Sequence, residues 1–255
     1  MIGSFIFNST SSESFGLISK SIQRPLLPTR KEDLVEIHGS SGIHDYGTDE
    51  YEVRKIIMEV TYREDNYINL RSKARQIAAW LSGGFWAPLI INDEPDKYYL
   101  AKVKDDIDLD SFYESGSAEI SFICQPFAFS IDETIVTFNA TNSTTAFTFT
   151  NEGTRLINFK SQPGSKFLIT ITGEWTNINI KLNGQTISFM ESGSSSTLII
   201  DNVDMKVTKD GVNKFHELSG DVDTFLKIIP GNNTIKITSG NINASVKIEF
   251  IPLWI

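Results

Sequence analysis

The sequence predicts a mostly β protein with two domains. The N-terminal domain is expected to be α+β, β-sandwich-like with one principal helix, and the C-terminal domain to be a β-sandwich or jelly roll. Three observations carry this prediction. Short segments of alternating apolar and polar residues recur through the second half, Asn- and Gly-containing turns separate them, and one segment in the first half has a helical period.

The composition changes near residue 130, which places the domains at residues 1–130 and 131–255. Residues 1–130 hold 13 Lys+Arg and 20 Asp+Glu, a net charge of -7, and residues 131–255 hold 10 and 12, a net charge of -2. Asparagine rises from 4 residues in the first part to 13 in the second. Asn and Gly tolerate the positive φ of tight hairpins, so the second domain is expected to consist of many strands joined by turns.

The N-terminal domain is predicted to alternate strands with a single helix. Its helical face is Leu70, Ala74, Ile77, Ala78 and Leu81. Gly83-Gly84 is expected to end this helix, and Asn66 or Asn69 to cap its start. The predicted strands are 56–62, 88–91, 98–103 and 118–123.

The C-terminal domain is predicted to contain short strands joined by hairpins. Asn183-Gly184 is the strongest hairpin signal, and Asp210-Gly211 and residues 230–233 are predicted turns. The predicted strands are 166–172, 177–182, 185–190, 198–200, 205–207, 225–229, 234–237 and 246–250.

Three basic residues, Arg71, Lys73 and Arg75, lie early in the predicted helix, where the helix dipole disfavours cations by a few tenths to about 1 kcal/mol each. Glu64 and Asp65 lie just upstream and could offset this cost. Two interpretations remain open, a surface that binds an acidic partner and a solvated basic face.

Three large aromatic residues near predicted loops are further candidates for an interface: Phe85, Trp86 and Trp175. Such side chains stack on sugar rings, anchor a protein partner, or fill a core or a seam between domains.

Sites for catalysis, metals or cofactors are not indicated. The single cysteine, Cys124, and three scattered histidines form no zinc pattern. Asp106, Asp108 and Asp110 could bind calcium, but they lack the glycine and distal glutamate of the usual loop, and an exposed strand face explains them as well. The sequence has no nucleophile elbow and no phosphate-binding loop, and nothing nominates a pair of glycosidase carboxylates. We therefore expect no enzymatic activity and no cofactor.

The net charge of -9 argues against binding to a phosphate backbone, which depends on Lys and Arg. The N-terminus lacks the features of an export signal, and no apolar run approaches the ~20 residues that span a bilayer. The sequence thus predicts no membrane partner and no specific nucleic-acid partner.

The order of motifs along the chain resembles that of siphophage distal tail proteins, the Dit or phage tail family. The motifs are Phe5-Ile6-Phe7-Asn8, Ser14-Phe15-Gly16-Leu17, Gly39 and Gly42 ahead of Tyr46-Gly47, Trp80-Leu81, Asp93-Glu94-Pro95 with Tyr98-Tyr99, Phe122-Ile123-Cys124-Gln125-Pro126, and, in the second half, 198–201, Val207, 210–211, Leu226 and 230–235. The stretch 131–159 matches least.

This resemblance implies a structural protein at the tail tip of a long-tailed phage or prophage, assembled in the cytoplasm of the host bacterium. Its N-terminal domain would form a homohexameric ring that joins the major tail tube protein to the tail-associated hub protein, with DNA passing through the lumen. Its C-terminal domain would be galectin-like, with its last strand packing back on the N-terminal domain, and would hold or replace a receptor-binding protein. The alternative function is a carbohydrate-binding module for the host surface; a wall hydrolase is the third hypothesis.

Overall fold

The chain divides into two units, residues 1–128 with Ile255 and residues 129–254. The computed structural model describes residues 3–47, 50–61, 67–104 and 117–255, and for residues 67–70 it describes the backbone only. Strands dominate both units, as the sequence predicted, and the helical segment lies in the first unit. The sequence-based boundary was placed two residues later, between residues 130 and 131.

The elements of the first unit are, in chain order, β1 (Phe5–Phe7), β2 (Thr10–Ser11), the 3-10 helix η1 (Ser12–Phe15), β3 (Ile18–Gln23), β4 (Leu34–Glu36), β5 (Ile43–Asp45), β6 (Arg54–Thr61), α1 (Tyr67–Leu81), β7 (Ala87–Ile91), β8 (Lys97–Lys104) and β9 (Ser117–Cys124). The strand β10 (Ala128–Ser130) spans the division between the units.

The elements of the second unit are β11 (Thr134–Ala140), β12 (Thr144–Asn151), β13 (Phe167–Leu182), β14 (Gln185–Phe189), β15 (Gly193–Asp201), β16 (Lys206–Lys209), β17 (Val212–Asn213), the 3-10 helix η2 (Phe215–Glu217), β18 (Leu218–Gly220), β19 (Gly231–Phe250) and β20 (Leu253–Trp254). Strands β11 and β12 occupy the stretch for which the sequence predicted no strand.

The sheet of the first unit has the strand order β2-β1-β7-β8-β9-β6-β3. Its buried face is built by alternation, since Ile56, Met58 and Val60 on β6 are all fully buried. Burial of each of these side chains stabilises the folded state by about 1.5–3 kcal/mol relative to exposure. The predicted strands of this half are confirmed, with end positions shifted by one or two residues.

Helix α1 packs its apolar side against this sheet. Ala74, Ile77 and Leu81 are buried, as predicted, whereas Ala78 is exposed, so the predicted face was too wide by one position. The Trp80 indole stacks on Phe5 at 5.7 Å between ring centroids, and its Nε1 donates to the Phe7 carbonyl at 3.0 Å. The helix ends at Leu81, shortly before Gly84, whose φ of 62° is left-handed.

The second unit is organised by two long strands, β13 and β19. They pair antiparallel from Phe167↔Phe250 to Leu182↔Ile235. Strand β15 extends the pair beside the first half of β13, and β14 beside the second half. On the other side, β11 and β12 pair with successive parts of β19. The inward positions alternate along both strands and are buried, which gives the β-sandwich that the sequence predicted.

Two pairs of strands predicted from the sequence are in fact continuous. The predicted strands 166–172 and 177–182 both lie in β13, and 234–237 and 246–250 both lie in β19. The pairing of β13 with β15 shifts register between Gly173 and Trp175. Close to this shift, the buried Ser239 hydroxyl of β19 bonds to the backbone N–H and carbonyl of Thr176. This polar bend resembles a loop in the sequence, but its backbone bonds are completed by the partner strand.

The two predicted hairpin turns are confirmed. Asn183 and Gly184 have φ of 48° and 88°, and Asp210 and Gly211 have φ of 51° and 80°, which is the left-handed pair that a two-residue hairpin needs. The predicted turn at residues 230–233 is only partly correct, because Gly231 already begins β19.

The predicted strand at residues 225–229 is wrong. The segment is largely buried and irregular. Within it only Ile228 makes a strand-type bridge, to Ile157, and side-chain amides bond the backbone on either side of that bridge. Asn202 accepts from the Leu226 amide at 3.2 Å, Asn183 donates to the Lys227 carbonyl at 3.0 Å, and Asn233 accepts from the Ile229 amide at 2.8 Å.

Candidate interface surfaces

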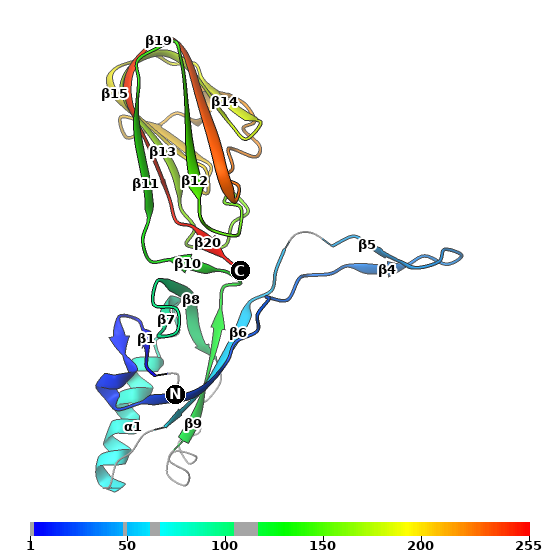
Figure 1. Cartoon of the computed structure of the whole chain (residues 1–255), viewed down its shortest axis with the longest axis vertical. Helices are drawn as coiled ribbons and strands as arrows, with labels where there is room; N and C mark the ends of the chain where they lie inside the picture. Colours follow the sequence, from blue (N-terminus) through cyan, green and yellow to red (C-terminus); the bar gives the residue numbers. More distant parts are fainter. Residues whose placement is uncertain (1–2, 48–49, 62–66, 105–116) are drawn as a thin grey trace. The chain divides into compact units, whose positions relative to one another are not determined.

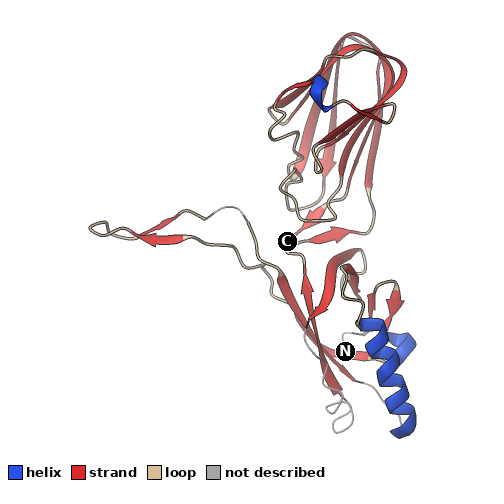
Figure 2. Cartoon of the chain, turned by 180° about the vertical axis from the view of Figure 1, so that it is seen from behind, coloured by secondary structure: helices blue, strands red, loops and turns tan. Residues whose placement is uncertain are grey.

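A two-stranded ribbon extends from the first unit between β3 and β6. Figures 1 and 2 both show it projecting on the side of this unit away from α1. Its outer part is the hairpin β4–β5, and its base is held by the Arg30↔Tyr51 bridge. All residues from 29 to 46 are exposed, including Leu34 (52%) and Ile43 (57%). Isolated two-stranded hairpins are marginally stable in water, which makes this ribbon a candidate interface.

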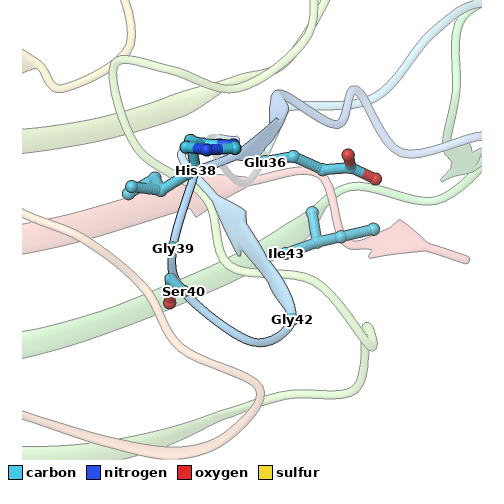
Figure 3. A pocket seen from close by; sticks show the side chains of 7 residues that line it. Glu36, His38, Gly39, Ser40, Gly42 and Ile43 are labelled. Atoms are coloured by element: carbon cyan, nitrogen blue, oxygen red, sulfur yellow. The ribbon is translucent and has the colours of Figure 1, made fainter.

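The register gives the ribbon two distinct faces. Leu34 is opposite Asp45 and Glu36 is opposite Ile43, so these four side chains share one face. Val35 and His44 lie on the other face. Figure 3 shows the Glu36 and Ile43 side chains pointing to the same side of the hairpin. We call the four-residue set, Leu34, Glu36, Ile43 and Asp45, the docking face.

The tip of the ribbon curves into a shallow hollow lined by residues 36–40, Gly42 and Ile43. Gly39 and Gly42 have φ of 88° and 95°, which lets the chain reverse direction there. His38 and His44 are exposed on this ribbon, and His44 belongs to β5. The hollow shows no arrangement of acids, bases or ligands that would support chemistry.

The basic residues predicted as an interface lie on α1, across the unit from the ribbon. Arg71 and Arg75 are exposed, and neither has a carboxylate within ion-pair distance in the described part of the chain. Lys73 is half-buried, with its Nζ 5.8 Å from the centre of the Phe15 ring. Ala78 and Ala79, on the later turns, are also exposed. The outward side of α1 is thus basic at its beginning and small and apolar towards its end.

Two of the three candidate aromatic residues also lie on the surface of the first unit. Phe85 is 53% exposed and Trp86 37% exposed, and both follow the C-terminus of α1. The Lys102 Nζ lies 5.3 Å from the centre of the Trp86 ring. Their exposure is compatible with the predicted interface role.

Trp175, the third aromatic candidate, lies in the core of the second unit. It is 2% exposed, its Nε1 donates to the Glu191 carbonyl at 3.1 Å, and Gly193 packs against its ring. Because its indole presents no face to solvent, the structure supports the core interpretation of Trp175 and removes it from the candidate interface.

Several predicted features lie outside the described residues. These are the aspartates of 105–110, the acidic pair Glu64 and Asp65, and the cap Asn66; the side chain of Asn69, the other cap candidate, is likewise not described. Within the described ranges, His, Cys, Asp and Glu side chains form no group of three that could hold a metal ion. In the same ranges, no helix has the length and apolar character needed to cross a bilayer.

A buried charged residue, Arg54, lies where the ribbon joins β6. Arg54 is 3% exposed, its Nη1 donates to the Tyr99 hydroxyl at 3.1 Å, and its Nε and Nη2 lack partners among the described residues. Burial raises the pKa of the neighbouring Cys124 thiol to about 12, against which the Arg54 charge acts only weakly. Cys124 is therefore a protonated, inert core residue.

The ribbon was the main feature that the sequence interpretation missed. That interpretation used Gly39 and Gly42 of this stretch only as part of the family resemblance. The signal was present, because two runs with β-forming residues, 34–37 and 43–46, flank a short Gly-containing loop. Nothing in the sequence showed that both faces of this hairpin stay uncovered.

Comparisons with known proteins agree with this architecture. Residues 11–124 match the family model described as "Phage tail protein RIFT-related domain". Among solved structures, SPP1 Dit, described as "a Paradigm of Hub Adsorption Apparatus in Gram-positive Infecting Phages", has a TM-score of 0.73 at 14% identity over 98% of this chain and 99% of that chain. A chain of the phage P2 baseplate gives a TM-score of 0.43 at 11% identity over 99% of this chain and 98% of that chain, and no argument depends on it. No curated protein sequence matches significantly. The resemblance to siphophage distal tail proteins and the predicted mostly β fold are confirmed.

Proposed function

We propose that this protein is a structural component of the tail tip of a long-tailed phage or prophage. Its first unit forms a homohexameric ring that joins the tail tube protein to the tail-associated hub protein. The observation that carries this proposal is the full-length likeness to SPP1 Dit, together with the phage tail domain at residues 11–124. The proposal includes no catalytic step.

The surface of the first unit supports assembly into a ring. Closed rings other than twofold dimers use head-to-tail contacts, in which two different surfaces of each copy meet. The exposed ribbon and the outward side of α1 are two different surfaces on opposite sides of the unit (Figures 1 and 2). The acidic charge of the chain, -9, fits a lumen through which DNA passes without specific binding.

Electron microscopy of negatively stained protein tests this proposal. The purified chain, alone or mixed with tail tube and hub proteins of the same phage, is expected to give sixfold rings. A strict monomer at high concentration that binds neither protein would overturn the proposal.

The second candidate function is binding of host-surface carbohydrate by the second unit. Its β-sandwich is proposed to be galectin-like. The supporting observation is the outward face of β12, β19, β13 and β14. Its register positions carry hydroxyl, amide and lysine side chains: Thr144, Thr148, Thr150, Asn179, Lys181, Thr186, Ser188, Asn232, Thr234, Lys236 and Thr238. Lys181 and Lys236 are direct register partners, and neither forms an ion pair with another described residue. An anionic wall polysaccharide would complement this face. A receptor-binding protein attached to the second unit is the competing partner.

A pull-down of the full chain with purified cell-wall polysaccharides tests the second candidate. Binding that weakens in the Lys181→Glu/Lys236→Glu variant would support it. Equal retention of the variant and the wild type, or no binding to any wall polymer, would remove it while leaving the ring proposal intact.

A further inference from the structure

Two strands of the second unit have one edge without a neighbouring strand. Among the described strands, β11 and β12 pair only with β19, so the other edge of each is free (green in Figure 1). The two strands have seven and eight residues. A free edge exposes backbone N–H and C=O groups that can pair with a strand of another chain.

These two edges lack the features that usually prevent such pairing. Neither β11 nor β12 contains a charged residue or a proline, and both pair with β19 without a register shift. The other edge strands of the two large sheets differ. Strands β2, β17, β18 and β20 have only two or three residues, and β3 contains Lys20 and a register shift between Ser19 and Ser21. Strands β11 and β12 are therefore the edges best suited to accept a further strand.

The alternation of hydrogen bonds shows which backbone groups of β12 are available. The Ser239 amide donates to the Ser143 carbonyl at 3.0 Å, directly before the register pair Thr144↔Thr238. In an antiparallel pair every second residue bonds to the partner strand, and the residues between them face the other edge. The residues of β12 that face the free edge are Thr144, Ala146, Thr148 and Thr150, and their side chains are exposed.

The inward side of the same edge is apolar and only partly covered. Phe147 of β12 and Phe138 of β11 stack with their ring centroids 4.6 Å apart and their planes at 3°. Both rings are half-buried, whereas Phe149, the next inward residue of β12, is buried. A strand added to β12 would place every second side chain on this inward side and remove more of the rings from water.

The chemistry of this edge specifies what can bind there. A charged side chain buried against β12 would lose its hydration without gaining an ion pair, because the strand has no charge. A fitting segment is extended and uncharged, with apolar side chains at every second position. The β12 strand of a second copy has this pattern, but two identical edges pair about a twofold axis, which the head-to-tail contacts of a single ring do not contain. The occupant is therefore a different protein.

We propose that the free edge of β12 accepts an antiparallel strand from a partner protein. The strand is uncharged, its outward residues bond to the backbone of Thr144, Ala146, Thr148 and Thr150, and its apolar residues cover Phe138 and Phe147. This contact goes beyond the function proposed above, and only the choice of a partner protein over a second copy rests on the ring.

A synthetic peptide tests the contact on the full-length chain. The peptide alternates threonine and valine between terminal lysines, and fluorescence anisotropy measures its binding. In an antiparallel strand with its valines inward, the threonine amides face β12 and the valine amides face solvent. N-methylation of two threonine amides is therefore expected to weaken binding about tenfold relative to N-methylation of two valine amides. Equal affinities of the two methylated peptides, or no binding of the unmodified peptide, would overturn the proposal.

Proline substitutions identify the edge that binds. Ala146→Pro removes an N–H that faces the free edge of β12 and no bond to β19, so it is expected to weaken binding of the unmodified peptide about tenfold. Thr137→Pro is the matched control on β11. The Ile251 amide donates to the Lys166 carbonyl, and the alternation along β19 then leaves the Thr137 N–H facing the free edge of β11.

The Thr137→Pro variant is expected to bind the peptide as the wild type does. Weaker binding by Thr137→Pro with unchanged binding by Ala146→Pro would contradict the assignment to β12. The methylated peptides are tested on the wild-type chain, so a folding defect in Ala146→Pro does not affect their outcome.

The contact and the ring fail in different ways. Sixfold rings in electron micrographs from a chain that does not bind the peptide would leave the proposed function standing and remove the contact. Peptide binding by a chain that forms no rings, even beside tube and hub proteins, would support the contact and remove the ring. Dimers of the free chain in sedimentation that Ala146→Pro abolishes would show that a second copy occupies the edge, and would remove the partner protein.

Discussion

The ribbon β4–β5 and the long pair β13–β19 are both antiparallel strand pairs, but only one is covered. On either side of their bends, β13 and β19 alternate buried with outward-facing residues and so fill the sandwich core, whereas each residue of β4 and β5 is exposed. Backbone hydrogen bonds are present in both, so they do not explain the difference. What stabilises the long pair is the apolar surface that its neighbours remove from water.

The ribbon differs from the long pair in that no other described segment covers its apolar side chains. A folded chain rarely keeps a long hairpin with several exposed apolar side chains unless another surface covers it. Substitutions at comparable positions in the two regions test this difference. Four predictions follow, from the largest expected effect on stability to the smallest.

The largest contrast is expected between two isoleucines. Ile180→Ala, in the core on β13, should lower the free energy of unfolding of the second unit by about 2–5 kcal/mol through lost burial and a cavity. Ile43→Ala, on the ribbon, should change the stability of the isolated chain by less than about 0.5 kcal/mol. Urea denaturation of both variants measures this. A large loss for Ile43→Ala would mean that the ribbon is packed in the single chain.

Two glycines with positive φ provide a second contrast. At Gly173, with φ 142°, a Cβ would lie 2.4 Å from the Asn243 carbonyl oxygen, whereas at Gly42, with φ 95°, nothing lies within 4 Å. Gly173→Ala should therefore destabilise the second unit by about 1–3 kcal/mol or more. Gly42→Ala should leave the urea midpoint of the chain unchanged, because the strain of the substitution is confined to the ribbon tip. Equal midpoints for the two variants would contradict this account of the β13 bend.

The base of the ribbon gives a smaller effect. Tyr99→Phe removes the hydroxyl that accepts a hydrogen bond from the buried Arg54 guanidinium and should destabilise the first unit by about 1–3 kcal/mol. Arg54→Met removes the buried charge itself and should lie closer to the wild type. Thermal unfolding shows which of the two variants is less stable. A larger loss of stability for Arg54→Met than for Tyr99→Phe would show that the guanidinium has a partner that the structure does not describe.

The smallest effect is expected in acid. Glu249 lies on the outward face of β19, with Lys247 and Lys166 at 3.0 and 3.4 Å. Partial burial alone would raise its pKa, but the hydrogen bond from Lys247 and the charges of both lysines outweigh burial, so the pKa lies below its ordinary value of 4.5. A lowered pKa gives stability that is present above 4.5 and is lost as the pH falls through the folded value.

Glu249→Gln should therefore reduce the loss of stability of the second unit between neutral pH and pH values below 4.5. Glu36→Gln on the ribbon is the matched control, since Glu36 makes no ion pair with the described residues, and its acid unfolding curve should coincide with that of the wild type. Identical curves for Glu249→Gln and the wild type would contradict the contribution of the Glu249 network.

Local chemistry was the part of the fold that could be predicted. The positive φ of Asn183 and Gly184 follows from residue type, and so does the end of α1 ahead of Gly84. Residues 56–62 were predicted as a strand, and the structure shows the alternating burial of β6 that follows because side chains on a strand point to opposite sides. Of the candidate interface, the exposed Arg71 and Arg75 were predicted correctly as surface residues, while Trp175 was equally compatible with a core or a surface position.

Long-range pairing could not be predicted from local sequence patterns. The bend near Gly173 and Ser239 remains in extended strands because each strand completes the hydrogen bonds of the other, and these partners are more than 60 residues apart. The irregular segment 225–229 is held by amides of Asn183, Asn202 and Asn233, which no local pattern connects with it. Local preferences, which act over a few residues, were enough to predict the helix, the two hairpin turns and many of the strands, but not β11, β12 or the ribbon. Which strands are continuous, which aromatic ring is buried and which hairpin stays uncovered depend on contacts between distant segments, and these exist only once the chain has folded.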